Sequence, residues 1–300
     1  MTDPHSEQQE VRACAGVVLY KPDVGLLARQ AAGLAGRTLF AFANGPLDDQ
    51  ALAALATVDL RLIRSPTNVG LGVGLNAVTQ AAARDGFSHI LLLDQDSEPS
   101  AALLDRLTAR CLARDATQPV AVLAPLLVPP AEGFYKPIRY ERRGPSEDGL
   151  VPLDFAPTSG SLLPLAAFAA VGPFREDFFI AGIDVEWGFR AWSRGWASYL
   201  AADLHMPHRW GEAVSAEELG KPQILRHSAL RNYYYARNVI ATARLGHVPW
   251  RWRLKSCLAL AAQSAVLALR GEGGSLAPVR AGLMDGLGGR LGPAPARWTR

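Results

Sequence analysis

The hydrophobic and polar positions of the first 125 residues alternate between two patterns. Short runs rich in apolar and β-branched residues are typical of strands, and several are apolar enough to be buried on both faces. The predicted strands cover 13–20, 38–43, 58–64, 89–94 and 120–125. Segments with helical spacing lie between them, over 24–35, 47–56, 72–84 and 101–113. This order predicts an α/β fold with a doubly wound, mostly parallel sheet flanked by helices, and a ligand site beyond the carboxyl ends of the strands.

The pattern changes after Pro125. Residues 129–149 are rich in proline, glycine and charge, which predicts an irregular excursion before strand character returns over 150–156. Helices are predicted over 185–194, 223–244 and 249–269, so the chain ends in a helical C-terminal extension. Residues 271–300 are rich in glycine and proline, and we expect them to be irregular or flexible.

The amino-acid composition excludes several classes of protein. The 300 residues are 49% hydrophobic and 20% charged, which excludes fibrous and wholly disordered classes. The three cysteines lie far apart, which argues against a disulfide framework and a zinc site. The polar opening MTDPHSEQQE does not resemble a secretory signal, and the apolar run over 254–269 is too short to span a membrane. We therefore expect a cytoplasmic protein.

The net charge of +3 hides an uneven distribution. Residues 1–220 hold 18 Lys and Arg against 26 Asp and Glu, whereas residues 221–300 hold 13 against 2. A basic C-terminal part predicts a polyanionic partner, which is either nucleic acid or anionic lipid. The alternative is a solvated basic surface.

Two acids follow the predicted strand over 89–94. Asp94 and Asp96 would stand at the carboxyl end of the sheet, where two carboxylates can bind a hard divalent cation. The alternative is turn chemistry, in which Asp96 or Ser97 caps the helix that starts near Ser100.

A second pair of acids, Asp184 and Glu186, stands at the start of the predicted helix near residue 185. Acids in a first helical turn are stabilised by the helix dipole, which is one explanation. The other is a carboxylate that serves as general base toward an incoming hydroxyl group.

Two further segments carry candidate ligand-binding residues. Pro207 separates His205 from His208, so any metal would meet a single histidine on a loop. In the segment 227–238, an arginine such as Arg231 or Arg237 could bind phosphate in a bidentate manner, and the neighbouring tyrosines could stack on a sugar or simply pack.

The order of the motifs resembles the family 2 glycosyltransferases, and most of all the bacterial rhamnosyltransferases of O-antigen and related polysaccharide assembly. The resemblance runs from about residue 13 to 245. It is carried by VVLYKPD (17–23), FANG (42–45), SPTNVGLGVGLNAV (65–78), LLLDQDSEPS (91–100), TSGSLLP (158–164), GPFREDFFIAGIDVEWGFRAWSRGW (172–196) and HSALRNYYYARN (227–238). The pattern departs at Ala43 and Ile183, where the family has Asp and Glu.

The resemblance implies a GT-A fold over 1–245, with a nucleotide-sugar half at about 13–125 and an acceptor half at about 150–245. A basic amphipathic helix and a flexible tail would follow over 246–300. The activity it implies is inverting transfer from a nucleotide sugar, dTDP-L-rhamnose, to a saccharide or lipid-linked saccharide acceptor in cell-surface polysaccharide synthesis.

The resemblance also assigns roles to single residues. Asp184 would be the catalytic base, and Glu186, Trp187 and Arg190 would contact the acceptor or support the site. Mg²⁺ or Mn²⁺ would be held by Asp96, Asp94 and His208. The nucleotide sugar would be bound by Tyr20, Lys21, Asn44, Asn68, Asp94, Gln95 and Arg237.

Several alternatives stay open. The donor could be another nucleotide sugar, such as a galactofuranosyl or glucosyl donor, or the chain could be a catalytically silent sugar- or nucleotide-binding module. A nicotinamide-dependent oxidoreductase is disfavoured, because the glycine-rich segment 68–76 follows the third predicted strand and not the first.

The basic helix predicted over 249–269 indicates where in the cell the protein acts. Trp250 and Trp252 alternate with Arg251, Arg253 and Lys255 beside an apolar face, which suits an anionic membrane surface better than nucleic acid. We therefore expect a peripheral protein on the inner face of the cell membrane. The alternative is that this helix packs on the body or in a homo-oligomer.

Overall fold

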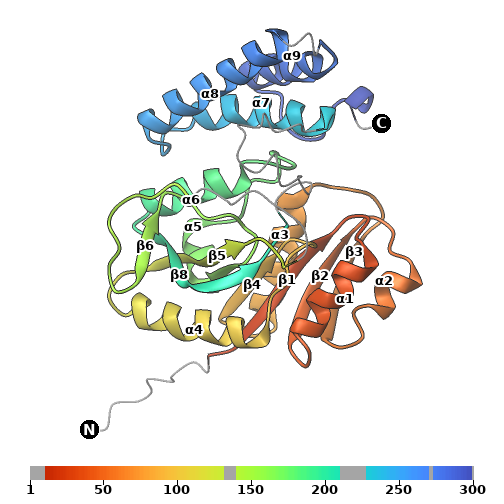
Figure 1. The fold of residues 1–300 in the computed structure, drawn as a ribbon, viewed down its shortest axis with the longest axis vertical. Helices are drawn as coiled ribbons and strands as arrows, with labels where there is room; N and C mark the ends of the chain where they lie inside the picture. Colours follow the sequence, from red (N-terminus) through yellow and green to blue (C-terminus); the bar gives the residue numbers. More distant parts are fainter. Residues whose placement is uncertain (1–10, 132–139, 210–227, 270–272, 299–300) are drawn as a thin grey trace.

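The computed structural model describes residues 11–131, 140–209, 228–269 and 273–298. One sheet of eight strands runs through the body, with the strand order β3-β2-β1-β4-β7-β5-β8-β6 (Figure 1). Its strands are β1 (Ala13–Leu19), β2 (Thr38–Asn44), β3 (Asp59–Ser65), β4 (His89–Leu93), β5 (Val120–Val128), β6 (Leu150–Leu153), β7 (Ser161–Pro164) and β8 (Ala197–Pro207). The strands β3, β2, β1 and β4 are parallel to one another, as are β5 and β8. The predicted α/β fold with a mostly parallel sheet is therefore confirmed.

Helices cover both faces of the sheet and build a separate core on each. The helices of the body are α1 (Val24–Gly33), α2 (Asp49–Ala53), α3 (Leu71–Arg84), α4 (Ala101–Asp115), α5 (Leu165–Val171) and α6 (Ile183–Ser193). One core joins α3, α5 and α6 to the sheet, and the other joins α1, α2 and α4 to its opposite face. Strand β1 serves both, because Val18 faces the first core and Val17 the second.

The predicted elements of the first 125 residues all form. Their helix starts are capped by side chains: Asp23 accepts from the backbone N–H of Leu26, and Ser100 accepts from that of Leu103. Helix α2 is shorter than the predicted segment 47–56, because residues 54–57 form turns. Capping and hydrophobic spacing depend on residues close together in the chain. The helices and strands of this half can therefore be predicted from the sequence.

Two strands of the second half were not predicted. Strand β7 is antiparallel to both β4 and β5, between which it lies, and β8 runs parallel to β5 and antiparallel to β6. Strand β7 has four residues, too few for a recognisable period. Strand β8 ends at Pro207 and delivers His208 to the carboxyl edge of the sheet.

Three helices form a layer beyond α6: α7 (Ala229–Ala243), α8 (Trp250–Leu269) and α9 (Gly273–Leu287), followed by the short turn η1 (Ala296–Trp298) (Figure 1). Residues 223–227 of the predicted helix lie outside the described residues. The expectation that residues 271–300 are irregular was wrong for Gly273–Leu287, which form α9, whereas residues 288–295 have no regular structure. The glycines of α9 are contact positions: a Cβ on Gly282 would lie 2.3 Å from the backbone oxygen of Tyr233, and one on Gly286 would lie 2.7 Å from that of Arg237.

Across the described helices, none combines the length and apolar character that a membrane crossing requires.

Candidate active site

The loop after β4 is held against β1 and α1 by side-chain amides. Gln95 accepts a hydrogen bond from the backbone N–H of Tyr20 at 3.0 Å. Gln30, which is fully buried in α1, donates to the backbone oxygens of Asp94 (2.8 Å) and Ser97 (3.1 Å). The two acids of this loop are therefore presented by a fixed backbone, and the side chain of Gln95 contributes to that support.

His208 lies next to the two acids, although it is more than 100 residues away from them in the sequence. A single antiparallel bridge pairs Ser97 with His208, and ligand atoms of Asp94, Asp96 and His208 all lie within 4.8 Å of one another. His208 Nδ1 is 3.7 Å from Asp96 Oδ1 and 3.3 Å from Ser97 Oγ. The three residues that the resemblance assigned to a metal thus come together in one cluster.

The electrostatics of the cluster suit a cation. Burial raises the pKa of the Asp94 carboxyl to about 7, and the negative charges of Asp96 and Asp184 add to this, while Arg231 opposes it. A carboxyl that resists ionisation beside other acids is short of positive charge, which a bound cation supplies. The two carboxylates are ligands that Mg²⁺ and Mn²⁺ both use, whereas the imidazole of His208 is a ligand more typical of a transition metal than of Mg²⁺. The residues therefore fit a divalent ion.

Asp184 lies in the first turn of α6, and its charge acts on Asp94 of the cluster. Its carboxylate helps to line a small cavity together with Leu92, Phe174 and Trp187. Burial raises the pKa of Asp184, and hydrogen bonds from the backbone N–H groups of Val185 and of Asp184 itself oppose the rise. A partly desolvated carboxylate with a raised pKa is suited to accept a proton.

The loop before Asp184 has a strained backbone. Phe179 and Ala181 adopt positive φ angles of 64° and 67°, a region that non-glycine residues rarely occupy. Each such residue costs on the order of 1–3 kcal/mol, so the surrounding contacts must fix the conformation. Asn238 donates to the backbone oxygens of Phe178, Ile180 and Ala181 at 2.8–3.0 Å. The amino-acid sequence alone does not indicate this role of Asn238.

Arg237 holds the same loop, which corrects its assignment to the nucleotide sugar. The side chain is fully buried and donates to the backbone oxygens of Asp177 (3.2 Å), Phe178 (2.9 Å) and Gly292 (2.5 Å). Its Nε donates to Asn238 Oδ1. All of these partners belong to the protein, so Arg237 cannot reach a phosphate.

Arg231 is the basic residue of α7 whose charge acts on the cluster. It is exposed, lies in the first turn of α7, and its charge lowers the pKa of Asp94. The sequence predicted that Arg231 and Arg237 lie on one helix and that either could bind phosphate. Which of the two faces the site depends on how α7 packs, and sequence does not show this.

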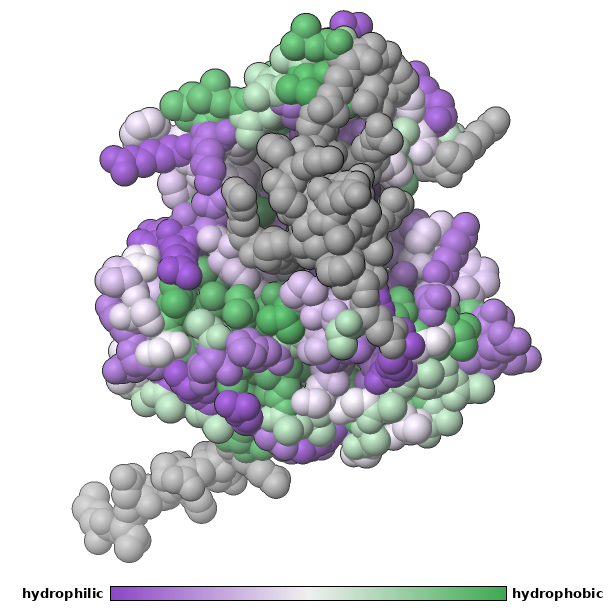
Figure 2. Space-filling view, in the orientation of Figure 1, coloured by the Kyte–Doolittle hydropathy of each residue, from purple (hydrophilic) through white to green (hydrophobic). Residues whose placement is uncertain are grey.

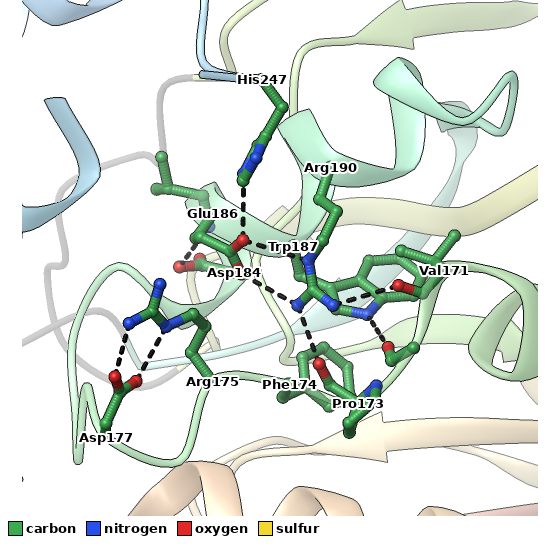
Figure 3. Close-up of polar contacts among 12 residues, drawn as sticks. Val171, Pro173, Phe174, Arg175, Asp177, Asp184, Glu186, Trp187, Arg190 and His247 are labelled. Carbon is green, nitrogen blue, oxygen red and sulfur yellow. Dashed lines mark hydrogen bonds and ion pairs between the residues drawn. The ribbon is translucent and has the colours of Figure 1, made fainter. Parts of the chain in front are cut away.

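Glu186, Trp187 and Arg190 support α6 from inside the protein (Figure 3). The Glu186 side chain is 2% exposed and accepts two hydrogen bonds from Arg190, at 3.0 and 2.9 Å. Arg190 also donates to the backbone oxygens of Val171 and Pro173, and the Trp187 indole donates to that of Gly172. These contacts lie within the protein, and they favour the second of the two predicted roles, in which the three residues support Asp184.

The predicted nucleotide contacts divide into two groups. Tyr20 and Lys21 are exposed after β1, with the Lys21 ammonium 5.5 Å from the centre of the Tyr20 ring. Asn44 is 3% exposed, accepts from the N–H of Val69 and donates to Asn68 Oδ1. Asn44 therefore positions the loop that carries Asn68, and Asn68 itself remains exposed.

A search for relatives supports the motif resemblance. No family model matches the chain. The dTDP-rhamnosyl transferase RfbF of Shigella flexneri is 26% identical over 63% of this chain and 65% of its own length, so the match spans just under two thirds of that relative.

Solved structures share the fold at low sequence identity. GalNAc-T7, crystallised with UDP, GalNAc and Mn²⁺, matches with a TM-score of 0.52 and 11% identity over 82% of this chain and 55% of its own. TarS of S. aureus matches with a TM-score of 0.51 and 12% identity over 92% of this chain and 55% of its own. The chain thus has the fold of the GT-A glycosyltransferases, and its sequence resembles the family 2 members that transfer rhamnose.

Proposed function

We propose that this chain is an inverting glycosyltransferase. It moves a sugar from a nucleotide sugar to a saccharide or lipid-linked saccharide acceptor in cell-surface polysaccharide synthesis. The observation that carries the proposal is the juxtaposition of Asp184 with the cluster of Asp94, Asp96 and His208 at one edge of the sheet. A proton acceptor beside a candidate cation site is the arrangement that transfer from a sugar diphosphate requires.

In the proposed reaction, the acceptor hydroxyl oxygen attacks the anomeric carbon of the donor. Asp184 takes the hydroxyl proton as the new C–O bond forms. The bond between the anomeric carbon and the diphosphate oxygen breaks, and its electron pair leaves with the diphosphate. Attack and departure on opposite faces invert the anomeric carbon.

The leaving diphosphate needs positive charge. Arg231 lies in the first turn of α7, where its charge acts on Asp94, and it would pair with the phosphate oxygens. A divalent cation bound by Asp94, Asp96 and His208 would supply further charge to the same group. Tyr20, Lys21 and Asn68 are exposed after β1 and β3, where the nucleotide would lie.

L-Rhamnose from dTDP-L-rhamnose is the donor we propose. The support is the printed activity of the Shigella relative together with the motifs that run through this chain. The structure of GalNAc-T7 with UDP and GalNAc favours a uridine nucleotide sugar as the second candidate.

A donor panel tests the proposal. The full chain is incubated with dTDP-L-rhamnose, UDP-N-acetylgalactosamine, UDP-galactofuranose and UDP-glucose, each with Mg²⁺, with Mn²⁺ or with EDTA. Mass spectrometry then records sugar transfer and donor hydrolysis. We expect turnover of dTDP-L-rhamnose that EDTA suppresses. Nucleotide binding without turnover of any donor would indicate a silent binding module and contradict the proposal.

A further inference from the structure

Exposed apolar side chains concentrate in the C-terminal helices. Nine large hydrophobic residues of the described chain are exposed, and six of them lie between residues 250 and 287: Trp250, Leu254, Leu258, Leu269, Met284 and Leu287. Figure 2 shows the corresponding green surface along the upper edge of the molecule, over α8 and α9. Such a concentration on one face marks an interaction surface more often than scattered exposed residues do.

The exposed residues of α8 form a continuous stripe. Trp250, Leu254 and Leu258 follow one another at intervals of four residues, and the exposed residues Ala261, Ala265 and Leu269 continue the same face. We call these six residues the apolar stripe. A helix of 20 residues is about 30 Å long, so the stripe runs along a substantial surface.

The other side of α8 is already covered. Leu260 and Leu267 are buried and share a small core with Ala236 and Val239 of α7 and Val279 of α9. Helix α8 is therefore apolar on two sides. The side with Leu260 and Leu267 packs against α7 and α9, whereas the apolar stripe has no such contact among the described residues. The stripe is not required to hold α8 in place.

The surroundings of the stripe are basic. Helix α8 contains no Asp or Glu, and it carries three basic residues, Arg251, Arg253 and Lys255. Arg251 is exposed beside the stripe, with its guanidinium 5.6 Å from the centre of the Trp250 ring. Arg253 instead donates inward to the backbone oxygens of Val248 and Gly246, and Lys255 pairs with Glu141.

We propose that the apolar stripe docks on the surface of an anionic lipid bilayer, with α8 lying in the plane of the headgroups. A tryptophan beside an arginine at one end of an apolar helix face suits the headgroup boundary, where the rings are half-buried and the cation meets phosphate. Two copies of this face would bring basic surroundings together without an acid on α8 to match them, so anionic lipid is the better complement.

Docking there would place the candidate active site near the bilayer. The Trp252 ring contacts Phe189 of α6 edge to face at 5.4 Å, and His247 Nε2 lies 3.0 Å from Glu186 of the same helix. The first turn of α8 is thus fixed to the helix that carries Asp184. This step rests on the proposed function, because it gives the docked enzyme access to an acceptor whose lipid lies in the same bilayer.

Vesicle co-sedimentation of the full chain tests the proposal. The vesicles contain phosphatidylcholine alone or phosphatidylcholine with phosphatidylglycerol, at low and high salt. We expect binding to the anionic vesicles that weakens with salt. The triple variant Trp250→Ser, Leu254→Gln and Leu258→Gln should bind at least about tenfold more weakly, and Arg251→Gln about fivefold more weakly.

Leu112→Gln is the matched control, because Leu112 is exposed on α4, outside the stripe, and its loss should leave vesicle binding unchanged. Absence of wild-type binding to anionic vesicles, or equal binding by the triple variant, would overturn the proposal. A wild-type dimer that the triple variant dissociates, with no vesicle binding, would assign the stripe to a second copy instead.

Two readouts separate this result from the proposed function. Circular dichroism checks that the triple variant is folded, and hydrolysis of the free nucleotide sugar checks its active site. A triple variant that hydrolyses the donor normally but fails to bind vesicles would support the docking surface. A wild-type chain that binds vesicles but turns over no donor would leave the docking surface standing and contradict the transferase.

Discussion

Asn238 donates its side-chain amide to the backbone oxygen of Ala181 at 2.8 Å, three residues before Asp184. Ala181 has a positive φ angle, and the same amide also holds Phe178 and Ile180. The conformation that presents Asp184 is therefore maintained from α7, by a residue that does not itself reach the cavity.

Asn238→Ala should lower turnover more than it lowers donor affinity. The substitution removes the donor of three hydrogen bonds to strained backbone and leaves the Arg237 Nε without its acceptor, which costs about 2–3 kcal/mol of folding stability. Denaturant unfolding measures the stability, and steady-state kinetics separate kcat from KM. Tyr235→Phe on the same helix is the control and should keep wild-type kcat. An Asn238→Ala enzyme with unchanged kcat would show that the loop does not need this support.

Arg231 and Arg237 should behave in opposite ways. Arg237→Lys cannot serve four acceptors and is expected to lose about 3 kcal/mol of stability. Arg231→Ala should leave the melting temperature unchanged, because its side chain is exposed, and should weaken binding of the nucleoside diphosphate. Calorimetric titration and thermal melting of both variants check this. Normal nucleotide affinity in Arg231→Ala would remove it from the diphosphate site.

The raised pKa of Asp184 predicts a specific pH dependence. A base must be ionised, so kcat/KM should fall as the pH decreases through a pKa that lies above the ordinary value for aspartate. The effect on stability has the opposite sign. A folded-state pKa above the unfolded one favours folding at low pH, and this contribution is lost as the pH rises.

Asp184→Asn should therefore melt at a higher temperature than the wild type at neutral pH and show no such gain at about pH 2.5, where the carboxyl group is protonated in the folded and the unfolded state. Thermal melting at both pH values is the measurement. An equal shift at the two pH values would mean that the charge of Asp184 is not the cause.

Glu186→Ala should destabilise the protein but should not change the pH dependence of the reaction, as the loss of a general base would. It leaves the Arg190 guanidinium without its carboxylate counter-charge in a mostly buried position, at a cost of about 3–5 kcal/mol. Glu186→Gln keeps one acceptor and should recover part of that stability. In the folded fraction of either variant, the acidic limb of the pH–rate profile should stay where it is in the wild type. A displaced limb would give Glu186 a direct part in proton transfer.

The sequence was informative where structure is set locally. The strand–helix repeat of the first half follows from hydrophobic spacing and caps such as Asp23 and Ser100. The meeting of Asp94 with His208 was anticipated through the resemblance, but its cause, strand β8, was not recognised in the sequence.

Long-range packing accounts for the errors. Arg237 and Arg231 are both arginines on the same helix. Arg237 is buried because α9 and the residues after it pack closely against α7. The glycines of residues 271–300 suggested flexibility, whereas Gly282 and Gly286 allow two helices to touch. The identity of a glycine or an arginine does not show which distant helix it will contact, because tertiary packing overrides local propensity.

The most direct test of the central claim is sugar transfer by the wild type and Asp184→Asn, measured side by side. Both proteins are incubated with dTDP-L-rhamnose, a divalent cation and a saccharide acceptor, and the product is detected by mass spectrometry. Binding of dTDP is measured on the same preparations. The account predicts transfer by the wild type, and dTDP binding without transfer by Asp184→Asn. Substantial transfer by Asp184→Asn would contradict it.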